Sequence, residues 1–167
     1  ALKGLYRQTD SNNGFQDKYN EKDNTIFDIY SENTNGKDPY NYIPGQKECG
    51  NYSVEGDCYN REHLIPQSVF NQASPMVSDP LHIWPTDGKV NGVRSSFPHG
   101  VVNNPTTTSK NGSKLGPNVN SGYSAGYSGT VFEPIDEFKG DIARAYFYFA
   151  TRYQENGIQG WSYAMFN

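Results

Sequence analysis

The chain has 167 residues, a length that suits one domain over 1–167 with one hydrophobic core. Aromatic residues make up 14% of it, more than disordered chains carry, and no run approaches the roughly 20 apolar residues of a membrane span. The formal net charge of −4 argues against a protein that holds nucleic acid by bulk positive charge. It leaves open a protein that holds phosphate locally through a metal ion.

The first half of the chain predicts short elements separated by turns. Ala1–Gln8 is expected to be a short helix, and Thr25–Tyr30 is a compact apolar segment that suits a helix or a strand. Two strands are expected further on, at Arg61–Ile65 and at Leu81–Trp84. Pro85 should end the second of them.

The second half predicts a helix start, a loop region and one long helix. Segment 86–91 is typical of a helix start, with Thr86 or Asp87 as the N-cap. Residues 101–129 are rich in Gly, Asn, Ser and Thr and predict long surface loops before a closing strand at Thr130–Phe132. A long helix is expected over Asp136–Tyr153. Its apolar face consists of residues at helical spacing: Ile142, Ala145, Tyr146, Phe149 and Tyr153.

The two cysteines, Cys49 and Cys58, lie close together in polar, glycine-containing sequence. A disulfide and a pair of free thiols are both open, and the loop setting favours the disulfide. Such a bridge would add about 2.5–3 kcal/mol in the chain-entropy account of disulfides. It would also indicate an oxidising compartment, so we expect a secreted or periplasmic protein.

The residues Arg61, Glu62 and His63 place a guanidinium, a carboxylate and an imidazole in succession. Strand alternation would send Glu62 and His63 to opposite faces. Both can serve one site only at a strand end, at a bulge, or where a neighbouring helix wraps the edge. The alternative interpretation is an exposed Arg–Glu pair beside a half-buried histidine.

A second segment shifts the balance towards a functional site. After a strand and a turn, it begins a helix that carries Asn91 between Lys89 and Arg94. A strand with His63, a second strand and a helix with Asn91 is the order that a ββα metal site requires. There a carboxylate and an amide oxygen bind a hard divalent ion, whose other positions stay open for water and phosphate.

These segments resemble the endonuclease I family, the secreted or periplasmic nucleases of the His-Me finger (ββα-metal) superfamily. The fragments that carry the resemblance follow one another across most of the chain: Phe27-Asp-Ile-Tyr-Ser31, Cys49-Gly-Asn-Tyr-Ser53, Cys58-Tyr-Asn-Arg-Glu-His63, Pro85-Thr-Asp-Gly88 with Val90-Asn-Gly92, and the helical stretch Phe138–Tyr148. The resemblance implies an α+β fold, in which a small antiparallel sheet with the ββα-metal unit at its centre packs on helices.

The resemblance also implies a metal-dependent, sequence-nonspecific endonuclease. Its substrates would be DNA and RNA, cleaved to 5′-phosphate and 3′-hydroxyl ends. His63 would be the general base that takes a proton from the attacking water, because a neutral imidazole is populated at neutral pH. Glu62 and Asn91 would be the protein ligands of Mg²⁺, with Mn²⁺ or Ca²⁺ as its replacements.

Three basic residues are candidates for contact with substrate. Arg94 lies one helical turn after Asn91 and is expected to act in catalysis as a phosphate clamp, with a solvated surface role as the alternative. Arg61 and Lys89 are candidates for the phosphate backbone, and for them a surface role is about equally open. We expect neither a membrane nor an obligate protein as a binding partner.

The chain departs from the family pattern in two places. Relatives often show two adjacent histidines before the Pro-Thr-Asp-Gly turn, where this chain has Leu81 and then His82, so His82 is expected to give support at most. His99 matches nothing catalytic and is expected in a surface loop. The chain also stops at Asn167, before the further helical segment that relatives often carry, which makes it a shortened relative or a fragment of a longer polypeptide.

Two other classes of function remain as alternatives. A non-enzymatic secreted binding module would use Cys49, Cys58, His63 and His82 as a structural zinc set, although their spacing matches no known finger. A catalytically inactive adhesin or inhibitor on a nuclease-like fold is the other alternative. The presence of all three candidate site residues in the two segments argues against it.

Overall fold

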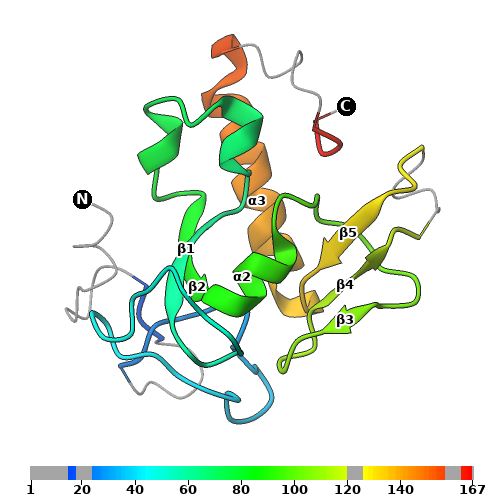
Figure 1. Ribbon diagram of the computed structural model, residues 1–167. Helices are drawn as coiled ribbons and strands as arrows, with labels where there is room; N and C mark the ends of the chain where they lie inside the picture. Colours follow the sequence, from blue (N-terminus) through cyan, green and yellow to red (C-terminus); the bar gives the residue numbers. More distant parts are fainter. Residues whose placement is uncertain (1–14, 18–23, 120–125, 157–162, 167) are drawn as a thin grey trace.

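The computed structural model describes residues 15–17, 24–119, 126–156 and 163–166 (Figure 1). Within these ranges the fold is α+β, as expected, with two antiparallel sheets and two α-helices. The strands are β1 (Tyr59–His63), β2 (Ile83–Asp87), β3 (Thr107–Thr108), β4 (Lys114–Pro117) and β5 (Thr130–Glu133). The α-helices are α2 (Gly88–Arg94) and α3 (Asp136–Arg152), and the short 3-10 helices are η1 (Gln67–Phe70), η2 (Met76–Ser78) and η3 (Gln154–Asn156). The helix expected at Ala1–Gln8 lies outside the described residues.

The first sheet is a two-stranded ribbon of β1 and β2, with Glu62 opposite Trp84 and His63 opposite Ile83. The expectation that Pro85 ends the second strand is wrong, because Pro85 pairs with Arg61 inside the ribbon. An edge strand tolerates proline, since its missing N–H leaves no ladder partner unsatisfied. β1 ends at His63, which places the imidazole at a strand end.

The helix start after β2 has the expected cap. Asp87 precedes α2, and its Oδ1 accepts a hydrogen bond of 2.7 Å from the backbone N–H of Val90. The other oxygen of Asp87 accepts hydrogen bonds from Tyr42 Oη at 2.6 Å and from the backbone N–H of Gly56 at 2.8 Å. The cap is therefore held by the preceding loop, and it fixes the orientation of α2 on the ribbon.

The long helix α3 passes behind α2 (Figure 1) and confirms the predicted helix and its apolar face. Its buried residues are Phe138, Ile142, Ala145, Tyr146 and Phe149, and Tyr153 follows as the buried C-cap. This face packs in one cluster with Leu64, Ile65 and Phe70, the segment that directly follows β1. Core packing therefore fixes the chain on the C-terminal side of His63.

The prediction of long surface loops over 101–129 is wrong in part. β3 and β4 lie inside that range and pair with β5 in a second antiparallel sheet. β3 is exposed and β4 is mostly half-buried, so neither strand shows the apolar alternation that marks a strand in sequence. Thr25–Tyr30 forms neither a helix nor a strand, although Ile26 makes an isolated bridge to Gln16. No helix in the described part of the chain combines the length and the apolar character needed to cross a membrane.

Candidate functional site

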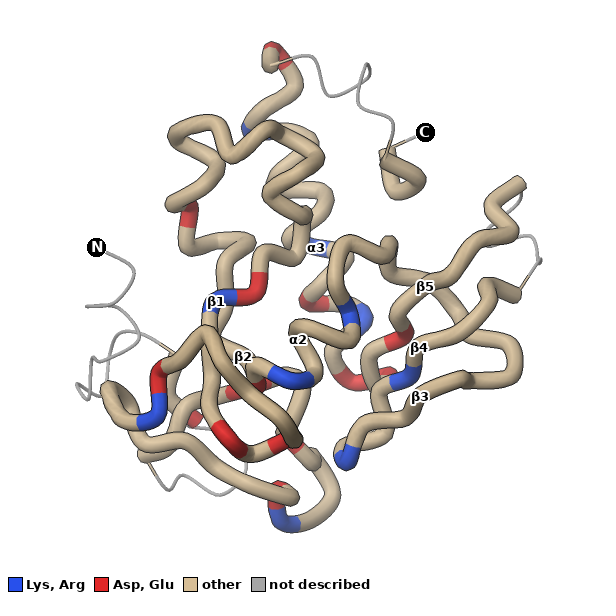
Figure 2. The backbone as a smooth tube through the Cα atoms, in the orientation of Figure 1, with Lys and Arg blue, Asp and Glu red and all other residues tan. Residues whose placement is uncertain are grey.

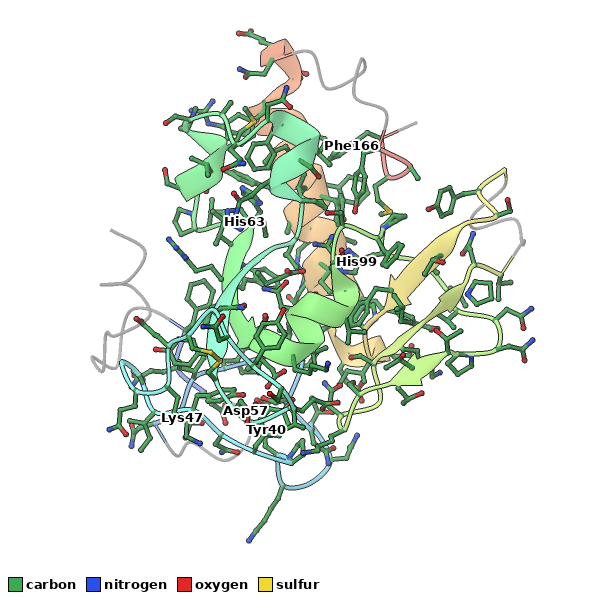
Figure 3. The ribbon with its side chains drawn as sticks, viewed as in Figure 1. Tyr40, Lys47, Asp57, His63, His99 and Phe166 are labelled. Carbon is green, nitrogen blue, oxygen red and sulfur yellow. A yellow bond between two sulfur atoms is a disulfide. The ribbon has the colours of Figure 1, made fainter. Side chains whose placement is uncertain are left out.

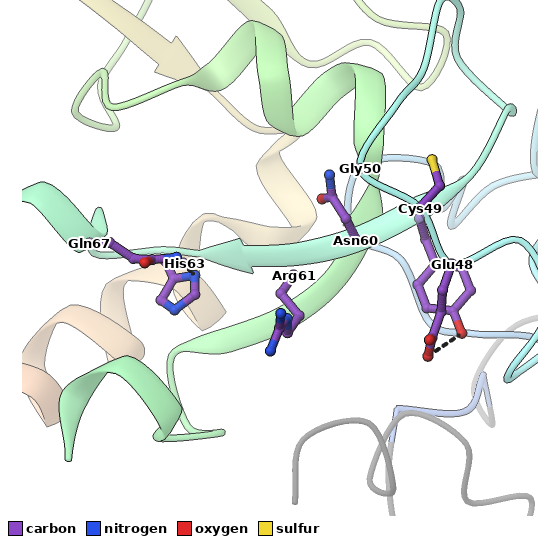
Figure 4. Close-up of a pocket in the computed structure, with 8 residues that line it drawn as sticks. Glu48, Cys49, Gly50, Asn60, Arg61, His63 and Gln67 are labelled. Atoms are coloured by element: carbon purple, nitrogen blue, oxygen red, sulfur yellow. Dashed lines mark hydrogen bonds between the residues drawn. The ribbon is translucent and has the colours of Figure 1, made fainter. Parts of the chain in front are cut away.

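A cavity of about 460 Å³ opens along the edge of β1 (Figure 4). Its walls consist of Glu48, Cys49, Gly50, Tyr59, Asn60, Arg61, His63 and Gln67. Arg61 and His63 point to one side of β1, whereas Asn60 points to the other side, towards α2 (Figure 4). The cavity therefore reaches both faces of the strand around its edge, and Glu62 is not among the residues that line it.

His63 lies at the end of β1, with 8% of its surface exposed. Its Nε2 lies 3.4 Å from the carbonyl oxygen of Val77, and its Nδ1 lies 3.1 Å from Nε2 of Gln67. A carbonyl oxygen can only accept, so the ring proton is on Nε2, and the lone pair of Nδ1 accepts a hydrogen bond from the Gln67 amide. Burial lowers the pKa of His63 to about 4, so the imidazole is neutral at neutral pH. The residue thus presents a proton acceptor at the cavity.

Glu62 is 1% exposed and lies on the face of β1 opposite His63. Its Oε1 accepts a hydrogen bond of 2.8 Å from Tyr30 Oη and lies 3.1 Å from Nη1 of Arg94. Burial raises the pKa of Glu62, while the positive charge of Arg94 opposes that shift. The hydrogen bond from Tyr30 and the ion pair with Arg94 both involve Oε1 of Glu62.

Asn91 lies in α2 and is half-buried. Its Nδ2 donates a hydrogen bond of 2.7 Å to Oδ1 of Asn60, which lines the cavity. This bond orients the Asn91 amide, and Oδ1 is the atom of that amide that could bind a metal ion. Glu62 Oε2 and Asn91 Oδ1 are the donor types that suit a hard divalent ion, which binds through few protein ligands and completes its shell with water and phosphate. The residues therefore fit Mg²⁺, although no cluster of three or more His, Cys, Asp or Glu side chains suited to a metal occurs among the residues described.

Arg94 lies beneath the site and not at its surface, so the prediction of a phosphate clamp does not fit its position. The side chain is 1% exposed, and its guanidinium donates to the carbonyl oxygens of His63 at 2.8 Å and Leu64 at 2.6 Å. It also pairs with Glu62 and contacts Tyr163 Oη at 3.3 Å. Arg94 therefore holds the backbone at the end of β1 and the Glu62 carboxylate, and it has little surface to offer a substrate.

The other two basic candidates differ in their position. Arg61 is exposed and lines the cavity beside His63, whereas Lys89 lies half-buried on α2 and is not among the residues that line the cavity. Basic and acidic residues are scattered and intermixed along the backbone of the described residues (Figure 2). Any attraction for a polyanion must therefore come from a few local charges.

The remaining histidines are both buried, and they lie in different parts of the core. His82 is fully buried behind His63, with Nε2 2.8 Å from the carbonyl oxygen of Met76 and its ring centroid 4.7 Å from that of Phe149. The expectation that His99 occupies a surface loop is wrong: its Nδ1 lies 3.0 Å from Tyr146 Oη, and burial lowers its pKa well below the usual value. Figure 3 shows His99 between α3 and the second sheet, away from His63.

The predicted disulfide between Cys49 and Cys58 is present, with 5.7 Å between the two Cα atoms. It ties the loop that carries Cys49 and Gly50, which lines the cavity, to the residue before β1. Because the two sulfur atoms are bonded to each other, they are not thiolate ligands. This overturns the alternative of a structural zinc site built from both cysteines.

No feature of the sequence indicated a role for Gln67. This residue begins η1, directly after Pro66, and places its amide on the lone pair of His63. Gln67 belongs to no recognised motif. The end of β1 and Pro66 lie between it and His63, so neither strand nor helix periodicity predicts that the two side chains meet.

Comparison with known proteins shows the family of this chain. A sequence model of the Endonuclease I family matches residues 2–167. An extracellular ribonuclease of Bacillus amyloliquefaciens is 35% identical to this chain over 98 residues, which is 58% of the chain. The matched region spans 29% of the length of that ribonuclease.

Proposed function

The chain belongs to the Endonuclease I family, and we propose that it is a secreted, metal-dependent endonuclease that cleaves DNA and RNA without sequence specificity. The observation that carries this proposal is the neutral imidazole of His63, whose Nδ1 lone pair is presented at a cavity beside a buried carboxylate and an oriented amide. In this proposal β1, β2 and α2 form the ββα-metal core, and 1–167 is one domain.

His63 is the general base in the proposed reaction. Its Nδ1 takes a proton from a water molecule whose oxygen forms the new bond to phosphorus. The bond from phosphorus to the 3′ oxygen breaks, and that oxygen takes a proton from solvent, leaving 5′-phosphate and 3′-hydroxyl ends. Proton transfer to a positioned base contributes about 10²–10⁴-fold to such reactions.

Glu62 and Asn91 hold the proposed metal ion, through Oε2 and Oδ1 respectively. When bound, Mg²⁺ supplies positive charge against the phosphate oxygens and the developing negative charge. The neighbours of the two ligands keep them in place: Tyr30 and Arg94 fix the Glu62 carboxylate, and Asn60 fixes the amide of Asn91.

Arg61 and Lys89 contact the phosphate backbone in this proposal, and Arg61 has the stronger support because it is exposed at the cavity. Contacts to phosphate position a nucleic acid without reading its sequence. RNA as a substrate and secretion are supported by the similarity to an extracellular ribonuclease, and the disulfide supports an oxidising compartment.

The metal site is tested by replacing Asn91 with alanine. Asn91→Ala removes an oxygen ligand but leaves Glu62 with Arg94, so the fold should persist. We expect the Mg²⁺ concentration for half-maximal cleavage of plasmid DNA and of RNA to rise at least about 10-fold, a typical minimum for lost support at a metal site. Titration calorimetry with Mn²⁺ should show the same loss of affinity.

Asn103→Ala, at an exposed asparagine, is the matched control and should behave like the unmodified protein. Cleavage that proceeds equally in EDTA and in Mg²⁺ would contradict the metal-dependent mechanism. Equal Mn²⁺ affinity in both variants would remove Asn91 from the site.

A further inference from the structure

Gln67 occupies a distinctive position at the candidate site. It is the first residue of η1 and lines the cavity together with Arg61 and His63 (Figure 4). The backbone of Gln67 is fixed, because the preceding Pro66 is buried and the carbonyl oxygen of Gln67 accepts a hydrogen bond of 3.0 Å from the N–H of Gln72. Its side chain is only half-buried, so the amide can rotate within the cavity while the backbone stays in place.

The Gln67 amide occupies the lone pair that the proposed reaction needs. Because Nε2 of His63 donates to the carbonyl oxygen of Val77, Nδ1 is an acceptor, and Nε2 of Gln67 at 3.1 Å is its donor. A water molecule that gives its proton to Nδ1 must take the place of this amide N–H. The amide oxygen Oε1 is then within reach of the same water molecule, since both ends of the amide belong to one planar group.

We propose that Gln67 orients the attacking water in the reaction proposed above, and this inference rests on that proposed function. When the amide rotates, the water donates one hydrogen to Nδ1 of His63 and the other to Oε1 of Gln67. Two fixed hydrogen bonds aim a lone pair of the water oxygen at phosphorus. The water oxygen bonds to phosphorus, its proton goes to His63, and the 3′ oxygen leaves and takes a proton from solvent.

A glutamine suits this role because its amide joins donors and an acceptor. In the free protein the donor satisfies the base, and in the complex the acceptor holds the nucleophile. Orientation of a nucleophile acts on the chemical step and not on the binding of the nucleic acid. The role therefore predicts a loss in kcat with little change in KM.

The test compares Gln67→Met with the unmodified protein and with Gln154→Met. Methionine keeps the length of the side chain but removes the amide. Gln154 is the matched control because it is an exposed glutamine at the first position of another 3-10 helix, η3. We expect Gln67→Met to lower kcat for plasmid nicking about 10- to 100-fold with KM within about 2-fold, and Gln154→Met to change neither.

A second variant and a second measurement keep the inference refutable. Gln67→Ala adds no bulk and should show the same loss in kcat. Melting temperatures of both Gln67 variants equal to that of the unmodified protein separate this loss from misfolding. In the metal-free protein, the ¹⁵N resonance of His63 Nδ1 should shift in Gln67→Met, because the hydrogen bond to that nitrogen is lost. It should stay unchanged in Gln154→Met.

The outcomes separate this inference from the proposed function. If the unmodified protein cleaves DNA and His63→Ala does not, but Gln67→Met retains kcat within about 2-fold, the role of Gln67 is overturned and the nuclease stands. If the unmodified protein does not cleave nucleic acid, or His63→Ala cleaves it equally well, the proposed function fails and this inference fails with it.

Discussion

Replacement of Arg94 by methionine should destabilise the protein strongly, because it leaves a buried carboxylate without its positive partner. Arg94 and Glu62 are each 1% exposed, and Nη1 of Arg94 lies 3.1 Å from Oε1 of Glu62. Breaking a buried ion pair by removing one partner typically costs about 3–5 kcal/mol. The carbonyl oxygens of His63 and Leu64 lose their donors as well, so the cost should lie towards the upper part of that range.

A loss of this size is a large part of the roughly 5–15 kcal/mol that stabilises a typical domain. For a chain of this length it should lower the melting temperature by roughly 10 °C. The Glu62→Gln/Arg94→Met double variant carries no charge at either position, so it should recover part of the loss. The coupling free energy between the two sites should reach about 1–3 kcal/mol.

Urea unfolding followed by circular dichroism, in EDTA, measures all four proteins of this cycle. A phosphate clamp predicts the opposite pattern, in which Arg94→Met leaves the free energy of unfolding unchanged and raises KM. A cost below about 1 kcal/mol together with additive single variants would refute the account of Arg94 as a buried partner of Glu62.

Two further predictions concern the disulfide and the buried residue His99. The Cys49→Ser/Cys58→Ser variant should lower the free energy of unfolding by about 2.5 kcal/mol, the chain-entropy value for a loop of this length. Urea unfolding of the variant and of the unmodified protein measures this difference. Because burial lowers the pKa of His99 in the folded protein, the unfolded chain binds the extra proton below about pH 6.5 and stability is lost as pH falls. Relative to His99→Gln, the unmodified protein should therefore lose up to about 1.4 kcal/mol for each pH unit below that value, and a pH-independent difference in urea midpoints would contradict the burial of this group.

The parts of the fold that sequence predicted are those with local physical signals. The face of α3 follows from helical spacing, and the cap at Asp87 follows from a carboxylate placed just before a helix start. β3 and β4 have no such signal, because their residues are mostly exposed or half-buried and the strands are held by pairing in the order β3–β4–β5. A proline excludes a strand only where the ladder needs a backbone N–H at that position. The two-stranded ribbon needs none at Pro85.

The candidate site likewise contains residues that the sequence predicted and residues that it did not. The order of Glu62, His63 and Asn91 in the chain predicted a strand–strand–helix arrangement, and the structure brings the three residues to one ribbon and its helix. The burial of Arg94 was not predictable, because it depends on carbonyl oxygens about 30 positions earlier in the chain. Gln67 was missed because its contact with His63 depends on the turn at Pro66.

The most direct test of the account is nicking of supercoiled plasmid DNA by His63→Ala at saturating Mg²⁺, with the unmodified protein alongside and EDTA as a second condition. The account predicts that His63→Ala loses about 10²–10⁴-fold in rate with an unchanged melting temperature, and that EDTA abolishes cleavage by the unmodified protein. A His63→Ala protein that nicks the plasmid within about 3-fold of the unmodified rate would contradict the assignment of His63 as the general base.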